Sequence, residues 1–214
     1  MEVKLNIPTT LNEITLKQYI EFDKLELSKN SEVQMKMIEI FCEVPNSIVR
    51  NMKATDIHEI CDMINSMFEI KPQLINSFEL NGIEYGFIPS LEDMSFGEYI
   101  DLDTFIGETE NLHRAMNVLY RPIELKQGNR YFIKDYDPDT NEVAKDFPLD
   151  AVLGAIVFFY RLGKDLSLVM MNSLDKENQE TLAQHLISQS ATDGTILSGD
   201  YLTEILQNLN ISLN

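Results

Sequence analysis

The 214-residue sequence contains no tryptophan, only two cysteines and no hydrophobic stretch that could cross a bilayer. The longest apolar run, Val152–Tyr160, is far shorter than the roughly 20 residues that a transmembrane helix needs. Cys42 and Cys61 each lie in an apolar run, which indicates core thiols in a reducing compartment. The first residues, MEVKLNIP, lack the apolar segment of a signal peptide. We therefore expect a soluble protein that is made inside the cell.

Basic residues are also scarce, because 17 Lys and Arg stand against 35 Asp and Glu, for a net charge of −18. A surface of this sign repels nucleic-acid phosphates and anionic lipids, so we predict no direct contact with nucleic acid or membrane. The same charge suits high solubility, a basic partner, or a place in a crowded assembly that needs no contact with DNA. GxSxG, P-loop, HExxH and dinucleotide-binding signatures are missing as well. We predict that the chain is not an enzyme and takes no cofactor, although paired carboxylates for acid/base chemistry stay open.

One pattern occurs twice, about 80 residues apart. Ile7-Pro8 followed by LNEITLKQYIEFD at 11–23 aligns with Ile88-Pro89 followed by LEDMSFGEYIDLD at 91–103, with one gap after the proline. Each copy then ends a second apolar run at a proline, in MIEIFCEVP at 37–45 and AMNVLYRP at 115–122. These matches favour a duplicated unit over independent use of a good helix start.

Both copies contain a capping box, in which a hydroxyl and a Gln or Glu three residues later satisfy each other's backbone N–H groups. The boxes are Thr15 with Gln18 and Ser95 with Glu98. Because proline disfavours helix in the residue before it, each Ile-Pro should end an extended segment. The unit is therefore predicted to run strand, turn, capped helix, second helix and proline stop.

The remaining elements follow from periodicity and turn residues. Asn81-Gly82 between alternating apolar residues predicts a β-hairpin over 78–87. The apolar helix expected over 149–162 is hydrophobic most of the way round, so we place it at the centre of the core. The other predicted elements are a strand over 3–7, helices over 16–27, 32–43, 46–52 and 55–68, a strand over 131–133, and helices over 175–189 and 199–209 with a linker between them.

The predicted fold class is α+β and predominantly helical. Two similar strand–turn–helix–helix units accompany a small β-hairpin or antiparallel sheet and a C-terminal helical segment. The predicted divisions are 1–75 for the first unit with extra helices, 76–147 for the hairpin and second unit, and 148–214 for the central apolar helix and the C-terminal helices. We expect all three to belong to one compact domain.

An acidic stretch between the last predicted strand and the central helix resembles a calcium-binding loop. Thr140 stands where the sharp turn of such a loop needs glycine, and its last ligand would be an aspartate rather than a longer glutamate. A turn joining two elements explains the same residues. We predict no metal and keep these residues only as weak candidates: Asp135, Asp137, Asp139, Asn141 and Asp146.

The histidines do not form a metal or catalytic pattern. His58 and Cys61 share a helix face, but a structural zinc site needs four ligands and no second pair is present. Cys42 could approach them only through an accident of folding. We interpret the cysteines as core residues, and we place His113 and His185 on solvated helix faces.

Four segments together resemble proteins from the virion-structure and assembly modules of tailed bacteriophages of Bacteroidetes, crAss-like phages among them. They are IPTTLNEITLKQYIEF at 7–22, LHRAMNVLYRPI at 112–123, YFIKDY at 131–136 and DFPLDAVLGAIVFFYRLGKDL at 146–166. The resemblance covers roughly residues 5–170. It implies a non-enzymatic role in building or filling the particle, and it supplies no catalytic residue.

We therefore predict a bacteriophage virion or assembly protein that acts by protein–protein contact, as packaged cargo or as a head–tail component. It would be made in the host cytoplasm and reside in the virion, with other phage structural or assembly proteins as partners. The alternatives are a tail-assembly chaperone that shields an apolar partner, a calcium-binding adaptor using residues 135–146, and an unrecognised hydrolase. The sequence leaves the oligomeric state open.

Overall fold

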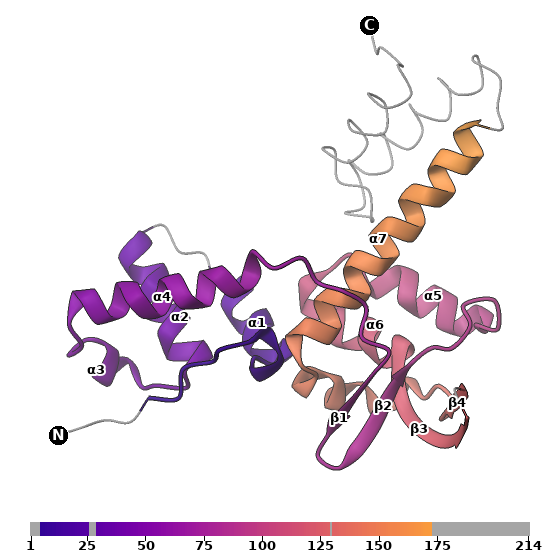
Figure 1. Cartoon of the computed structure of the whole chain (residues 1–214), viewed down its shortest axis with the longest axis horizontal. Coiled ribbons are helices and arrows are strands. Elements are labelled where there is room, and N and C mark those ends of the chain that lie inside the picture. Colours follow the sequence, from indigo (N-terminus) through magenta and orange to yellow (C-terminus); the bar gives the residue numbers. More distant parts are fainter. Residues whose placement is uncertain (1–4, 26–28, 129, 173–214) are drawn as a thin grey trace, which may run out of the picture.

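The computed structural model describes residues 5–25, 29–128 and 130–172. Within these residues the protein is α+β and predominantly helical, as predicted, and four strands form one antiparallel sheet (Figure 1). None of the described helices is long and apolar enough to cross a membrane. The predicted helices over 175–189 and 199–209, and the linker between them, lie outside the described residues.

The N-terminal part is a group of helices: α1 (Leu16–Asp23), α2 (Asn30–Phe41), α3 (Asn46–Val49) and α4 (Ala54–Phe68). All four were predicted, with ends that differ by a few residues. Their inward faces are apolar and buried, including Ile38 and Ile64, which are fully enclosed. The predicted strand over 3–7 is wrong for the part that is described, because residues 5–8 are irregular and have no strand partner.

The sheet has the order β1-β2-β3-β4, with β1 (Ser77–Leu80), β2 (Ile83–Phe87), β3 (Tyr120–Gln127) and β4 (Arg130–Ile133). The hairpin between β1 and β2 is confirmed. Asn81 and Gly82 both have positive φ, 52° and 77°, as a two-residue type I′ turn requires.

The second helical unit consists of α5 (Phe96–Phe105) and α6 (Leu112–Leu119). The prediction that Pro122 ends the second helix is wrong. Helix α6 stops at Leu119, and Tyr120 starts β3, in which Pro122 pairs with Tyr85. No loop separates the two elements, since α6 ends at Leu119 and β3 begins at Tyr120.

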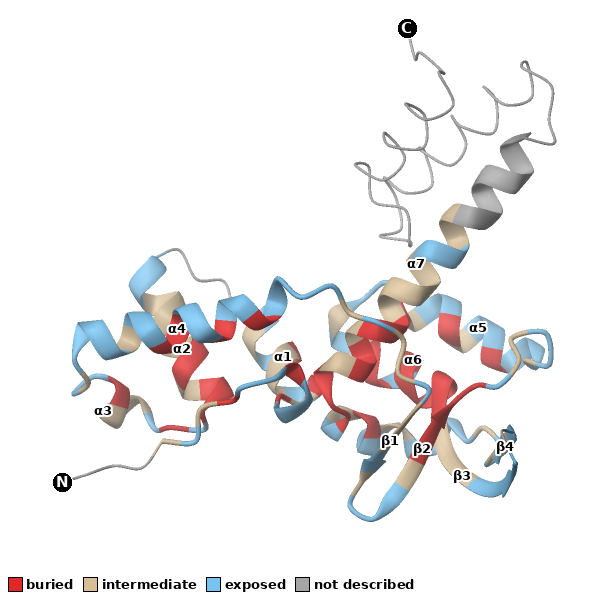
Figure 2. Ribbon diagram, viewed as in Figure 1, coloured by how far each residue is buried: buried red, intermediate tan, exposed pale blue. Residues whose placement is uncertain are grey.

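Helix α7 (Leu149–Asn172) begins in the core, and its residues become less buried along the helix as far as Lys164, from red to tan and pale blue in Figure 2. Leu149, Ala151, Val152 and Ala155 have no exposed surface, which confirms the central position for the first turns. From Ile156 to Tyr160 the residues are only half-buried, so the predicted central role does not extend along the whole helix.

The start of α7 is tied to the start of α1. The Leu16 N–H donates to the Phe147 carbonyl at 2.9 Å, and the Leu149 N–H donates to the Ile14 carbonyl at 2.8 Å. This pair of hydrogen bonds joins the N-terminal helices to the rest of the core.

The two repeat copies share their helix starts but not their surroundings. Both predicted capping boxes form, at Thr15 and at Ser95. The aligned residues differ in burial, because Leu16 is fully buried whereas Phe96 is 77% exposed. The duplication therefore remains a hypothesis about origin, and the outward face of α5 has to be explained in its own right.

Candidate functional site

Helix α5 carries three large apolar side chains on the protein surface. Phe96 is 77% exposed, Tyr99 56% and Ile100 45%. They stand at positions i, i+3 and i+4 of one helix, so they form one patch, which we call the α5 face. Single exposed apolar residues are ordinary, but a contiguous apolar patch usually marks a contact site.

A groove of about 230 Å³ adjoins the α5 face. Its lining includes the buried Leu102 of α5, the buried Ile106 that caps the end of this helix, and one ring from α7, Phe159. The Phe159 ring lies 5.3 Å from that of Phe158 and 6.3 Å from that of Phe87, so the wall continues into the core. The groove residues are Leu91, Met94, Tyr99, Leu102, Asp103, Ile106 and Phe159.

Polar contacts on other sides of α5 hold the helix in place. Glu98 is buried, completes the capping box with the Ser95 N–H at 2.7 Å, and forms an ion pair with Arg121 of β3 at 2.8 Å. Burial opposes ionisation of Glu98, but the hydrogen bonds from Ser95 and the charge of Arg121 outweigh it and lower its pKa.

A second polar contact fixes the middle of α5. The Tyr136 hydroxyl donates to the Asp101 carboxylate at 2.7 Å, and burial together with this bond raises the pKa of Tyr136. Helix α5 is therefore anchored through both Glu98 and Asp101 while the α5 face stays exposed. A fixed apolar face loses little conformational entropy when a partner covers it.

The chain around the groove carries charge of one sign. Residues 72–112 contain no Lys, Arg or His. The acids of this stretch are Glu79, Glu84, Glu92, Asp93, Glu98, Asp101, Asp103, Glu108 and Glu110, nine in all.

Three of these acids stand at the groove. Asp103 lines it, and Glu92 and Asp93 are exposed between the lining residues Leu91 and Met94. None of the three forms an ion pair with another described residue, whereas Glu84, Glu98 and Glu110 do. The groove therefore presents an apolar surface beside uncompensated carboxylates.

The sequence interpretation missed this site. Alignment with the first copy placed Phe96 and Ile100 opposite Leu16 and Ile20, which are buried, and so implied a buried face. Two signals were nevertheless present in the sequence. The apolar residues of 96–106 cover more of the helix circumference than one inward stripe needs, and the surrounding stretch contains no basic residue.

The weak metal candidates do not form a metal site. Residues Pro138–Asp146 form a 3₁₀-helix, η3, in place of a calcium-binding loop, and Asp137 caps it by accepting from the Asp139 N–H at 3.0 Å. Asn141 donates its side-chain amide to the Pro138 carbonyl at 2.7 Å. In the part of the chain that the structure describes, no three His, Cys, Asp or Glu side chains are grouped to hold a metal ion.

Asp139 and Asn141 instead line a polar cavity of about 320 Å³ together with Arg114. The Arg114 guanidinium lies 5.0 Å from the Phe105 ring centre, a cation–π contact that keeps a positive charge at this cavity. A fixed cation opposes binding of a second one, and Asp135 and Asp146 do not line the cavity. This geometry gives the calcium interpretation no support.

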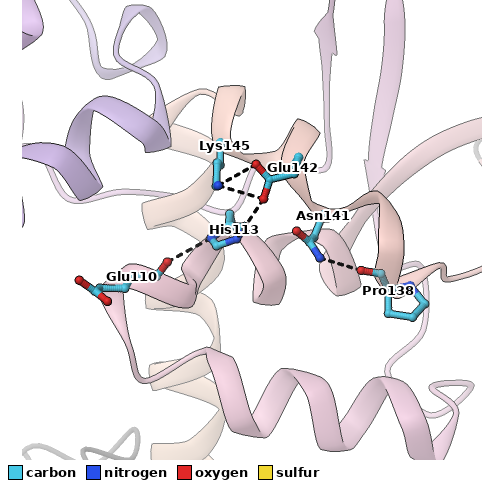
Figure 3. A network of polar contacts seen from close by, with 6 residues as sticks. All are labelled: Glu110, His113, Pro138, Asn141, Glu142 and Lys145. Atoms are coloured by element: carbon cyan, nitrogen blue, oxygen red, sulfur yellow. Dashed lines mark hydrogen bonds and ion pairs between the residues drawn. The ribbon is translucent and has the colours of Figure 1, made fainter.

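His113 is buried, so its predicted position on a solvated face is wrong. Figure 3 shows its ring between two neighbours: Nδ1 lies 3.1 Å from the Glu110 carbonyl, and Nε2 lies 4.0 Å from the Glu142 carboxylate. Lys145 also binds Glu142, at 2.7 Å. Burial and the nearby Lys145 lower the pKa of His113, so the neutral ring is favoured. His185 lies outside the described residues.

The cysteines are core residues. Cys42 and Cys61 are both buried thiols, and burial raises the pKa of Cys42 to about 11. His58, on the same helix as Cys61, is exposed and bonds to the Ala54 carbonyl of its own helix. The expectation of core cysteines is confirmed.

Comparison with protein-family models, with curated proteins and with solved structures finds no match to this chain.

Proposed function

We propose that this chain is a non-enzymatic bacteriophage virion or assembly protein that acts through protein–protein contact, with the α5 face and its groove as the contact surface. The observation that carries this proposal is the exposure of Phe96, Tyr99 and Ile100 on one anchored helix. Aromatic side chains such as Tyr99 beside a pocket are typical of residues that dominate binding energy at interfaces.

The phage assignment rests on the sequence resemblance given above. Under this assignment the chain is packaged cargo or a head–tail component, and its partners are other phage structural or assembly proteins. The acidic surface supports a partner other than nucleic acid or membrane.

A tail-assembly chaperone is the second candidate. One feature favours it: the groove lining is apolar except for Asp103 and includes Met94, whose flexible side chain can adapt to different apolar segments. A chaperone leaves before the particle matures, whereas a virion component stays.

Photocrosslinking tests the contact surface. A photoreactive phenylalanine analogue replaces Ile100 in the full chain during phage production, and the matched control carries it at Met63, a similarly exposed apolar residue of α4 (47% against 45%). We expect a discrete crosslinked phage protein from position 100 and none from position 63. Equal products from both positions, or none from either, would contradict the proposal.

Mass spectrometry of purified particles separates the two roles. Presence in a fixed ratio to the capsid protein supports a virion component. A crosslink in infected cells combined with absence from mature particles supports the chaperone.

A further inference from the structure

We propose that the α5 groove binds a basic amphipathic helix of a partner protein, whose apolar side enters the groove and whose Lys and Arg side chains meet the surrounding carboxylates. The inference rests on the proposed function and specifies the partner's chemistry. A helix laid along an apolar groove is a common mode of recognition, in which residues at i, i+3, i+4 and i+7 make the contact.

Charge complementarity selects the partner. Asp103 lies in the groove lining, and Glu92 and Asp93 are exposed in the segment that forms one wall. On the α7 side, neither Arg161 nor Lys164 lines the groove. A partner that carried acids here would suffer like-charge repulsion in an already acidic protein, whereas a basic one gains both affinity and faster association.

A second copy of this chain would be a poor occupant. It would bring a net charge of −18 of its own, and a symmetric α5–α5 contact would place Asp103 of each copy near the same acids of the other.

The chain's own C-terminal region is disfavoured on the same ground. Residues 173–214 contain six acids and a single lysine, Lys176. The amphipathic stretch predicted over 199–209 contains Asp200 and Glu204 and no base. The acids of residues 173–214 are Asp175, Glu177, Glu180, Asp193, Asp200 and Glu204.

Three synthetic peptides of equal length test the proposal by fluorescence anisotropy with the full chain. The first has leucines on one helical face and lysines elsewhere. The second has glutamates in place of the lysines, and the third has the composition of the first in an order that scatters the leucines. We expect the first to bind at least about tenfold more tightly than either control, and its affinity to fall as salt rises.

Substitutions on the exposed surface locate the binding. Tyr99→Ser removes an exposed ring from the groove lining and Asp103→Lys reverses a charge there, and each should weaken binding of the first peptide by about tenfold. The matched controls are Met63→Ser and Glu59→Lys, two exposed residues of α4, a helix that lies far from α5 in Figure 1. We expect these two to bind as the parent does, and all four variants to retain the parent's thermal unfolding.

Several results would overturn the inference. Equal affinity for the basic and acidic peptides would refute the proposed preference for a basic partner. If the α4 control substitutions weaken binding of the basic peptide as much as the groove substitutions do, the binding is non-specific electrostatic attraction. A dimer in sedimentation that Tyr99→Ser dissociates would assign the groove to a second copy. Tighter peptide binding after Leu206→Ser would assign it to the C-terminal region.

The two proposals fail in different ways. A crosslinked partner at position 100 that lacks a basic amphipathic segment would refute the charge inference and leave the protein-contact function intact. If no phage protein is crosslinked from position 100, the proposed function is refuted, regardless of the peptide-binding results.

Discussion

Glu98 and Arg121 form an ion pair of 2.8 Å that joins the first turn of α5 to β3, with both side chains about nine-tenths buried. The corresponding residue of the first repeat copy makes a comparable link without charge: the Gln18 side-chain amide donates to the Ile40 carbonyl near the end of α2 at 3.0 Å. In both copies the last residue of the capping box therefore ties the capped helix to a later part of its unit.

Glu98→Gln should destabilise the protein by about 3 kcal/mol, because it leaves the Arg121 charge buried without its partner. Urea unfolding at pH 7 measures the change. Glu92→Gln is the matched control, since Glu92 is exposed and unpaired, and its effect should stay within about 0.5 kcal/mol. A similar small loss for both variants would show that the ion pair does not stabilise the fold.

His113 should make stability depend on pH below neutrality. Its pKa is lowered in the folded protein, so the unfolded chain takes up a proton first as the pH falls below the ordinary histidine value of about 6.5. Stability is then complete above that pH and declines as the pH falls toward the lowered pKa of the folded state. Urea midpoints at pH 7.5 and 5.5 should differ less in His113→Gln than in the parent.

His58→Gln is the control for that measurement, because His58 is exposed on α4. It should keep the parent's decline between the two pH values. If His113→Gln also keeps the full decline, another group is responsible.

Gly154→Ala should cost about 2 kcal/mol despite the better helix propensity of alanine. The added methyl group would overlap the backbone carbonyl of Gln73, where the segment leading to β1 crosses α7. Gly97→Ala in α5 has open space around the new methyl and should gain about 0.5–1 kcal/mol. Thermal unfolding of the two variants should therefore shift in opposite directions; a shift in the same direction would contradict the close crossing.

Phe147→Ala should be among the most damaging substitutions, at about 3–5 kcal/mol. Its ring is 1% exposed and lies 5.0 Å from the rings of both Phe78 and Tyr85. Phe132→Ala on β4 is the control, because that ring is 53% exposed. Denaturant unfolding that ranks the two variants equally would place the core elsewhere.

Phe158 and Phe159 illustrate the limit of periodicity. The apolar run around them predicts a helix, and a helix is present. The apolar pattern does not indicate at which residue along the helix the buried core ends. Both rings are only half-buried, and Phe159 lines the groove. A helix that is apolar all round is consistent with a core position and equally with a surface that a partner covers.

The sequence by itself determined the local features of this protein. The two capping boxes, the Asn81-Gly82 hairpin and the core cysteines follow from interactions among residues a few positions apart or from strong burial preferences. Only the tertiary structure decided that β3 follows α6 directly, that His113 is enclosed by η3, and that the α5 face points outward while its aligned counterpart in α1 is buried. Those outcomes depend on which distant segments cover each side chain, and a local pattern cannot specify that covering.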